Sequence, residues 1–281
     1  MDNGYITLNN GVKMPQLGFG TIGQSGSQIT ENVAFALNCG YGLIDTANRY
    51  GNETEVGEGL KKSGLKREEY FLETKLGPTL YEHDRAVDDT LKRLQVDWID
   101  LMILHHPVNN YIYGYKLLEK AYREGKVRAI GISNFPADKI KEVLEQCDIK
   151  PMVMQAECHP YYPAEQVKPF LDENGIALQS WYPLGHGNWD MLRDPVFLEL
   201  AGKYHKSPAQ VILRWHMQMG QGAVPGSRSK EHIRENGDIF DFALSEDEME
   251  RIAGVNKHVP FYQVTPESLQ KLAVTKCNFE S

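Results

Sequence analysis

Cysteine is scarce in this chain of 281 residues, and long apolar runs are absent from it. The four cysteines, at positions 39, 147, 158 and 277, show no regular spacing and include no C-x-x-C pair. This pattern indicates buried thiols in a reducing compartment. No apolar run approaches the roughly 20 residues needed to span a bilayer, and the first ten residues lack the basic start and apolar stretch of a signal peptide. We therefore expect a soluble, cytoplasmic protein.

Positive charge is in the minority. The chain has 30 Lys and Arg residues against 38 Asp and Glu residues, which gives a formal net charge of −8. This balance argues against a protein that binds nucleic acid through phosphate backbones, and we expect no membrane partner. Apolar residues make up 41% of the chain and aromatic residues 10%, which is enough for a substantial core and too much for a disordered chain.

Short apolar runs alternate with amphipathic segments along most of the chain. The opening segment predicts a β-hairpin, with strands at 5–8 and 12–14 around a turn at 9–11. Eight further strands are expected at 16–20, 43–45, 70–75, 99–105, 127–133, 153–157, 177–181 and 223–225. Helices are expected at 28–39, 53–63, 82–94, 114–124, 136–147, 164–174, 208–218 and 230–236, with an extra helix at 195–204.

Eight strand–helix units within about 265 residues predict an α/β fold, a (β/α)8 TIM barrel with an N-terminal β-hairpin. Several predicted strands are nearly continuous apolar runs, which is typical of a parallel sheet covered on both faces. A capping box at 245–248 predicts one more helix. No linker or low-complexity run divides the chain, so we interpret residues 1–281 as one domain. Segment 255–281 has no clear periodicity and is expected to be a loop folded over one end.

A glycine pattern near the start of the chain offers a competing interpretation. Gly18, Gly20 and Gly23 spell G-x-G-x-x-G after a strand, and Asp45 follows about 20 residues later, as in a dinucleotide-binding fingerprint. Taken alone, the pattern favours a doubly wound nucleotide-binding fold. It follows an N-terminal hairpin, however, its helix begins several residues late, and the strand count reaches eight. We therefore favour the barrel.

Polar residues stand where the predicted strands end, and in such a barrel the chemistry lies at the C-terminal ends of the strands. Each of these residues alone has an ordinary explanation, because strand ends are often polar. Asp45, Tyr50, Lys75 and His105 together at one rim are harder to explain in that way. The ends of the later strands add Ser133, Asn134, Gln155 and Trp181.

These residues belong to a chain that resembles the aldo-keto reductases along nearly its whole length. Segments 40–57, 126–135 and 224–236 are similar to the three signatures of that family, and segments 100–107 and 209–215 match outside the signatures. Several long motifs in the right order make the resemblance specific. It implies reversible hydride transfer between a nicotinamide cofactor and a carbonyl group.

The resemblance implies a role for each of the four rim residues. A carbonyl that accepts hydride develops negative charge on its oxygen, so it needs a proton donor and a polarising contact. Tyr50 would be the general acid, and the charge of Lys75 would lower its pKa from the ordinary value of about 10. Asp45 would hold Lys75 in place, and His105 would donate a hydrogen bond to the substrate oxygen.

The resemblance also implies the cofactor contacts. Ser133, Asn134 and Gln155 would hold the nicotinamide carboxamide. Trp181 would stack on the nicotinamide ring, and Thr21 would lie near its ribose. The contacts to the pyrophosphate, the ribose and the adenine would come from Leu184, Gly185, Ser227, Glu235 and Asn236.

Two positions bear on the choice between NADP and NAD. The family usually carries Lys and Arg, both associated with the 2′-phosphate of NADP, where this chain has Gly226 and His232. Loss of two charge-assisted contacts to phosphate weakens the preference for NADP. Arg228, Lys230 and Arg234 lie in the same segment, and Arg228 is the best placed to replace them. We therefore expect use of both cofactors, with NADH used far better than is usual for the family.

Two further departures concern the substrate. The family commonly has Trp where this chain has Gly77 and His106, so two aromatic walls are missing. The pocket should be wider or more polar there, which favours small polar aldehydes and keto compounds, unless the C-terminal tail refills the space. Ile22, in the first strand–helix loop, is a third residue assigned to the substrate.

The adjacent His105 and His106 invite comparison with a metal site. Neighbouring residues on a strand point to opposite faces, so the two rings are not expected to share one ion. The nine histidines include no H-x-H or H-E-x-x-H pattern. We therefore expect no metal.

Two other functions remain open on the sequence alone. One is a barrel hydrolase or lyase that uses Lys75 as a Schiff base, and the other is a non-catalytic cofactor-binding barrel that acts as a regulatory subunit. For the quaternary state we expect a monomer or a weak homo-oligomer.

Overall fold

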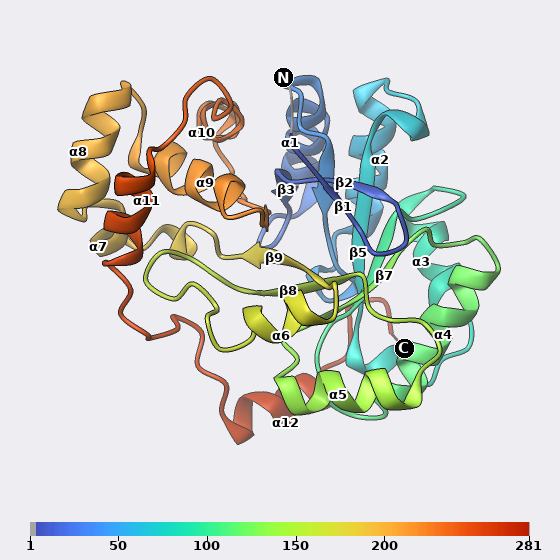
Figure 1. The fold of residues 1–281 in the computed structure, drawn as a ribbon. Helices are drawn as coiled ribbons and strands as arrows, with labels where there is room; N and C mark the ends of the chain where they lie inside the picture. Colours follow the sequence, from blue (N-terminus) through green and yellow to red (C-terminus); the bar gives the residue numbers. More distant parts are fainter. Residues whose placement is uncertain (1–3, 281) are drawn as a thin grey trace.

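The computed structural model describes residues 4–280. Eight strands form its centre, and each pairs in parallel with the next along the chain. Figure 1 shows the helices arranged around these strands. The strands are β3 (Gly18–Gly20), β4 (Leu43–Asp45), β5 (Phe71–Leu76), β6 (Leu101–Leu104), β7 (Ile130–Ser133), β8 (Val153–Glu157), β9 (Ala177–Trp181) and β10 (Gly222–Ala223).

Contacts between β10 and β3 close the sheet into a barrel. Leu17 and Ala223 form a parallel bridge, and the backbone N–H of Gly20 donates to the carbonyl of Pro225 at 3.0 Å. The predicted (β/α)8 barrel is confirmed, and the doubly wound alternative is wrong. A Cβ atom on Gly20 would lie 2.7 Å from the carbonyl oxygen of Val224. This glycine therefore permits the close approach that seals the barrel.

The N-terminal hairpin is also confirmed. It pairs β1 (Tyr5–Thr7) with β2 (Lys13–Pro15) in antiparallel fashion. In its turn, the Asn9 side-chain amide donates to the carbonyls of Pro151 at 2.9 Å and Gly175 at 3.2 Å. Both carbonyls precede strands of the barrel. The hairpin therefore lies at the N-terminal ends of the strands, which leaves the C-terminal ends to the functional groups.

The predicted helices are present, with shifted ends in several cases. Helix α6 begins at Lys168 rather than at 164, with a proline in its first turn, because proline is tolerated there and not in a helix interior. The helices around the barrel are α1 (Gly26–Asn38), α2 (Glu53–Ser63), α3 (Ala86–Leu94), α4 (Tyr111–Arg123), α5 (Ala137–Gln146), α6 (Lys168–Glu173), α8 (Pro195–Tyr204), α9 (Pro208–Gln218) and α10 (Lys230–Gly237).

The C-terminal part of the chain differs from the sequence prediction. The capping box at Ser245 is confirmed and begins α11 (Glu246–Ala253). The tail beyond it was expected to be a loop, but it contains α12 (Pro266–Val274), which Thr265 caps through Ser268. None of the side chains of α12 is buried, although Leu269, Leu272 and Ala273 follow helical spacing and are its less exposed apolar residues, a periodicity that the sequence prediction overlooked. Figure 1 shows a long extended connection, in orange-red, between α11 and α12.

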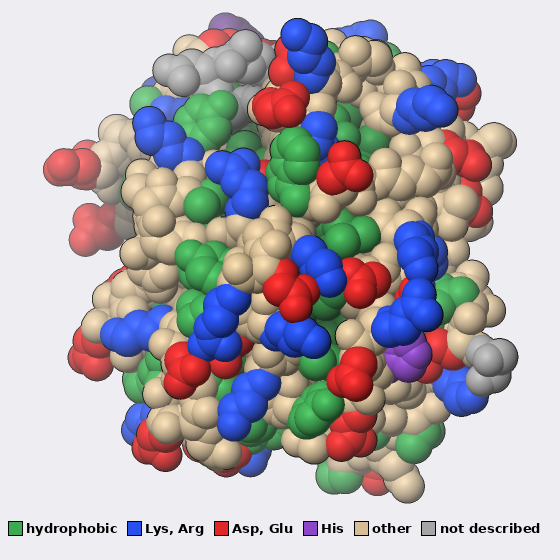
Figure 2. Space-filling view, turned by 90° about the vertical axis from the view of Figure 1, so that its right-hand side faces the viewer, with side chains coloured by type: hydrophobic (Ala, Val, Ile, Leu, Met, Phe, Trp, Pro, Cys, Tyr) green, Lys and Arg blue, Asp and Glu red, His purple; other side chains and the backbone are tan. Residues whose placement is uncertain are grey.

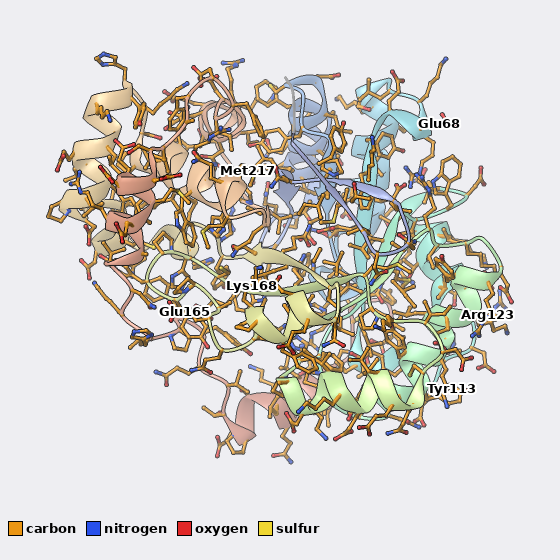
Figure 3. The ribbon with its side chains drawn as sticks, in the orientation of Figure 1. Glu68, Tyr113, Arg123, Glu165, Lys168 and Met217 are labelled. Atoms are coloured by element: carbon orange, nitrogen blue, oxygen red, sulfur yellow. The ribbon has the colours of Figure 1, made fainter. Side chains whose placement is uncertain are left out.

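The apolar side chains of the strands belong to one buried cluster, so the barrel is a packed core; Figure 3 shows side chains throughout the space between the elements. Tyr113 and Arg123 of α4 lie at the outer edge of the molecule in that view. On the face drawn in Figure 2, Lys and Arg side chains are interspersed with Asp and Glu, so this face carries no extended patch of one sign. Within residues 4–280, no helix is long and apolar enough to cross a membrane.

Candidate active site

Asp45, Tyr50 and Lys75 meet at the C-terminal end of the barrel. Asp45 ends β4, Lys75 lies on the neighbouring β5, and Tyr50 lies in the 3₁₀ turn η1 (Asn48–Tyr50) that follows β4. The Lys75 ammonium donates to the Asp45 carboxylate and, at 3.2 Å, to the Tyr50 hydroxyl. It also donates to the backbone carbonyl of Thr46 at 3.0 Å. Lys75 is only 1% exposed and Asp45 only 3% exposed, so the two side chains form a buried ion pair.

The electrostatics of Tyr50 differ from the sequence expectation. Burial raises its pKa to about 12, and the positive charge of Lys75 opposes only part of that shift. The expected lowering of the Tyr50 pKa by Lys75 is therefore present, but burial outweighs it and the pKa lies above its ordinary value. For Lys75, burial alone would lower the pKa, but the acidic groups around it, Asp45 first among them, together outweigh burial and the pKa is raised. Tyr50 thus stays protonated and Lys75 stays charged at neutral pH.

His105 follows the end of β6 and completes the group of four. Its ring lies edge-on to the Tyr50 ring, with the ring centroids 6.0 Å apart. Burial and the nearby charge of Lys75 lower its pKa well below the usual value, so the imidazole is neutral. Its Nδ1 atom is buried and has no hydrogen-bond partner within the described chain. A neutral ring can present one N–H to the site as a hydrogen-bond donor.

The His105 and His106 rings do not point to opposite faces, contrary to the prediction from strand alternation. Strand β6 ends at Leu104, so the alternation of faces no longer applies, and the His105 and His106 rings stack with centroids 4.4 Å apart. Burial lowers the pKa of His106 to about 3, and its Nδ1 lies 3.3 Å from the Asn134 amide. Across residues 4–280, no three or more His, Cys, Asp or Glu side chains are grouped to hold a metal ion.

The structure brings together the residues assigned to the nicotinamide. Asn134, in a left-handed conformation after β7 (φ 63°), donates to the Ser133 hydroxyl at 2.9 Å and accepts from the Trp181 indole at 2.9 Å. The Gln155 side chain lies deeper, where its amide nitrogen is 3.1 Å from Asp45. Asn134 and Trp181 are partly exposed, whereas Ser133 and Gln155 are buried, and the group of four connects to the catalytic group through Gln155 and Asp45.

The residues assigned to the pyrophosphate, ribose and adenine come from two segments: Leu184 and Gly185 follow β9, Ser227 precedes α10, and Glu235 and Asn236 lie in the last turn of α10. The Arg228 guanidinium crosses to the β3–α1 loop and donates to the carbonyl of Gly23. The Lys230 and Arg234 cations each lie 5.3 Å from the ring centroid of Phe35. His232 is exposed, on the first turns of the same helix. Three cations thus flank the segment that lacks the family's usual Lys and Arg.

Comparison with known proteins follows from this geometry. A family model described as the aldo/keto reductase family matches residues 16–257. The chain belongs to the aldo/keto reductase family. It is 41% identical to a glyoxal reductase of Bacillus subtilis over 257 residues, which cover 90% of this chain and 92% of the relative. It is 42% identical to a morphine 6-dehydrogenase of Pseudomonas putida over 267 residues, which cover 88% and 89%.

A solved aldo-keto reductase has the same architecture. The crystal structure of an aldo-keto reductase from Bombyx mori in complex with NADP superposes with a TM-score of 0.88 and 29% sequence identity. The match covers 94% of this chain and 96% of that one. The family and the barrel inferred from the sequence are therefore confirmed.

In this aldo/keto reductase, the space beside Gly77 is filled by the C-terminal tail. A Cβ atom on Gly77 would lie 3.4 Å from the Cys277 thiol and 3.4 Å from Cγ of Arg49. The Arg49 guanidinium donates to the carbonyls of Leu272 at 3.2 Å and Thr275 at 2.9 Å, which fixes the tail there. Of the two outcomes that the sequence left open at Gly77, a wider pocket or a space refilled by the tail, these contacts favour the second.

A second part of the tail packs near Trp181. The buried Glu157 carboxylate, at the end of β8, accepts from the backbone N–H groups of Phe261 at 2.6 Å and Tyr262 at 3.1 Å. The Phe261 ring stacks on His159 with centroids 4.4 Å apart, and the Tyr262 ring lies edge-on to Trp181 at 5.7 Å. The sequence did not predict these contacts, although the capping signal at 265–268 indicates a helix in the tail.

Proposed function

We propose that this protein reduces aldehydes or ketones to alcohols with NADPH or NADH, and that Tyr50 is the general acid. The observation that carries the proposal is the chain of contacts from Asp45 through Lys75 to the Tyr50 hydroxyl at the C-terminal rim of the barrel. The bound nicotinamide would supply the hydride. The family assignment and the relative named as a glyoxal reductase support a carbonyl substrate.

The protein groups then handle the proton and the developing charge. A protonated Tyr50 gives its proton to the carbonyl oxygen as negative charge builds there. Lys75, charged and 3.2 Å from the Tyr50 oxygen, stabilises the phenolate that remains. The neutral His105 imidazole donates a hydrogen bond to the same substrate oxygen, which orients it and stabilises its charge. Asp45 keeps the Lys75 ammonium in place and balances its charge.

The residues present fit a dinucleotide cofactor. The Thr21 hydroxyl is buried without a partner in the described chain, and because buried polar groups are normally hydrogen-bonded, this hydroxyl is available to a bound ligand. Ser133, Asn134 and Gln155 would hold the carboxamide, and Trp181 would stack on the nicotinamide. The other contacts would come from Leu184, Gly185, Gly226, Ser227, Arg228, His232, Glu235 and Asn236. With Gly226 and His232 supplying no fixed charge and Arg228 nearby, both NADPH and NADH would be used.

Small polar aldehydes and keto compounds are the proposed substrate class. His106 offers a neutral polar ring where the family commonly has Trp, and Ile22 is 49% exposed in the first strand–helix loop. The closure of the space beside Gly77 by Cys277 adds to the argument for small substrates. The Schiff-base alternative is disfavoured, because an amine that is ion-paired and has a raised pKa is a poor nucleophile.

The decisive experiment follows absorbance of the reduced cofactor with methylglyoxal and a nitrobenzaldehyde, using NADPH and NADH in parallel. We expect oxidation of both cofactors that depends on the carbonyl compound. Borohydride treatment in the presence of either carbonyl compound, without cofactor, tests the Schiff-base alternative by mass spectrometry. A covalent adduct on Lys75 with no cofactor oxidation would replace the proposal with a Schiff-base enzyme. Cofactor binding without turnover of any carbonyl would favour a non-catalytic barrel.

A further inference from the structure

A second carboxyl group lies buried beneath the catalytic ion pair. Glu73 is on β5, two residues before Lys75, so the two side chains share the inner face of the strand. Glu73 is fully buried. Its carboxyl oxygens lie 3.2 Å from the side-chain nitrogen of Gln155 and 2.9 Å from that of Gln179. The mechanism above assigns no role to it.

The side-chain amide of Gln155 has more hydrogen-bond acceptors around its nitrogen than it has N–H groups. Its amide nitrogen lies 2.7 Å from the Gln179 oxygen, 3.1 Å from Asp45 and 3.2 Å from Glu73. An amide group has two N–H bonds, so it can make full hydrogen bonds to only two of these three oxygens. The reverse orientation of the amide would place its oxygen against the same three oxygens. Asp45 and Glu73 are register partners on the neighbouring strands β4 and β5, so their side chains lie side by side on the inner face. A proton on Glu73 supplies the donor for a hydrogen bond between the two carboxyl groups.

The charge count points the same way. The charged and titratable groups that face Glu73 are Asp45 from β4, Lys75 from its own strand and Tyr50 from η1, while β8 and β9 contribute the neutral Gln155 and Gln179. If Asp45 and Glu73 were both ionised, one ammonium would face two buried carboxylates, and an unpaired buried charge is strongly unfavourable. Burial, followed by the nearby Asp45 carboxylate, raises the pKa of Glu73 well above its usual value.

We propose that Glu73 is held as a neutral carboxylic acid that donates a hydrogen bond to Asp45 and so positions Asp45 against Lys75. Its neutrality keeps the buried group balanced at one positive and one negative charge. Glu73 is thus a positioning residue that acts through Asp45. Its effect on catalysis rests on the proposed reductase function, whereas its protonation state does not.

Infrared spectroscopy tests the protonation state without any substrate. At pH 8, ordinary carboxyl groups, with pKa values of about 4, are ionised, so a neutral acid stands out by its C=O stretch. We expect this band in the wild type and its absence from Glu73→Gln. Glu53 is the matched control, because it is equally buried but is paired with Arg93 at 2.8 Å. The band should persist in Glu53→Gln. A wild type without the band, or a band that survives in Glu73→Gln, would overturn the proposal.

The pH dependence of stability is a second test that is independent of activity. When folding raises the pKa of a carboxyl group, the folded protein becomes less stable as the pH rises. The loss begins near the pKa of the group in the unfolded chain, about 4.3, and continues up to its pKa in the folded protein. In denaturant titrations, the folding equilibrium constant of the wild type relative to Glu73→Gln should therefore fall by up to tenfold per pH unit between pH 6 and 8. A ratio that does not change with pH over this range would contradict a neutral Glu73.

Activity tests the positioning role. The Gln side chain in Glu73→Gln can still donate to Asp45, so kcat should stay within roughly threefold of the wild type. In the wild type, ionisation of Glu73 at alkaline pH should lower kcat, and this decrease should be absent from Glu73→Gln. Glu73→Val cannot donate, and kcat should fall on the order of tenfold with cofactor binding unchanged. Equal kcat in Glu73→Val and the wild type would refute the positioning role of Glu73. If Glu73→Val does not fold, the infrared test with Glu73→Gln still decides whether Glu73 is neutral. If no variant reduces any carbonyl but the infrared band is present, the proposed function fails and the neutral acid stands.

Discussion

Removal of the Lys75 charge should reduce stability as well as activity. Lys75 is 1% exposed, and its ammonium is the cation paired with the equally buried Asp45. In Lys75→Met the carboxylate would remain in the barrel without a counter-charge. Breaking one side of a buried pair costs about 3–5 kcal/mol, against a total of about 5–15 kcal/mol for a typical protein. The variant should therefore fold less stably, and its activity must be measured under conditions where it is folded.

A double-mutant cycle separates this electrostatic effect from the chemistry. Urea unfolding would be followed by circular dichroism for the wild type, Lys75→Met, Asp45→Asn and the double variant. Because the double variant has no unpaired charge, we expect it to regain at least about 2 kcal/mol over Lys75→Met. All three variants should lose carbonyl reduction by on the order of 100-fold or more. A Lys75→Met protein as stable as the wild type, or a double variant that is less stable than both single variants, would refute the ion-pair argument.

Three other predictions follow from the site. The Trp side chain in Gly77→Trp should collide with the tail and lower the melting temperature. It should also raise KM for branched carbonyls more than for methylglyoxal. Equal effects on the KM of both substrates would show that Gly77 does not line the site. Gly226→Lys combined with His232→Arg should shift the kcat/KM ratio at least about tenfold toward NADPH, the equivalent of 1.4 kcal/mol; a wild type that prefers NADPH a thousandfold through Arg228, as judged with Arg228→Ala, would contradict this. Because the pKa of Tyr50 is about 12, loss of the Tyr50 proton should not lower kcat/KM for reduction near pH 10, the ordinary pKa of tyrosine. A decrease in kcat/KM near pH 8 that is absent from Tyr50→Phe would contradict this prediction.

The barrel and its four rim residues could be predicted because the signals are local. The apolar run of each strand and the periodicity of each helix stand in the sequence, and the barrel topology carries Asp45, Lys75 and His105 to the same end. The position of the tail could not be predicted in this way. The side chains of α12 are all at least partly exposed, and its position depends on distant contacts such as Arg49 with Thr275.

The electrostatics of the site also required the structure. The sequence places Lys75 near Tyr50, but the balance between the Lys75 charge and burial depends on how much protein surrounds the phenol. Glu73 illustrates the same point. Its place on an inward-facing strand position is predictable by alternation, whereas its lack of a cation partner is a property of the packed interior.

The central claim is that Tyr50 supplies the proton in a cofactor-dependent carbonyl reduction. The most direct measurement is kcat for methylglyoxal with NADPH and NADH in the wild type and Tyr50→Phe, with cofactor affinity measured in parallel by fluorescence quenching. Our account predicts turnover in the wild type, and a loss on the order of 100-fold or more in Tyr50→Phe with unchanged cofactor affinity. Wild-type kcat in Tyr50→Phe would contradict it.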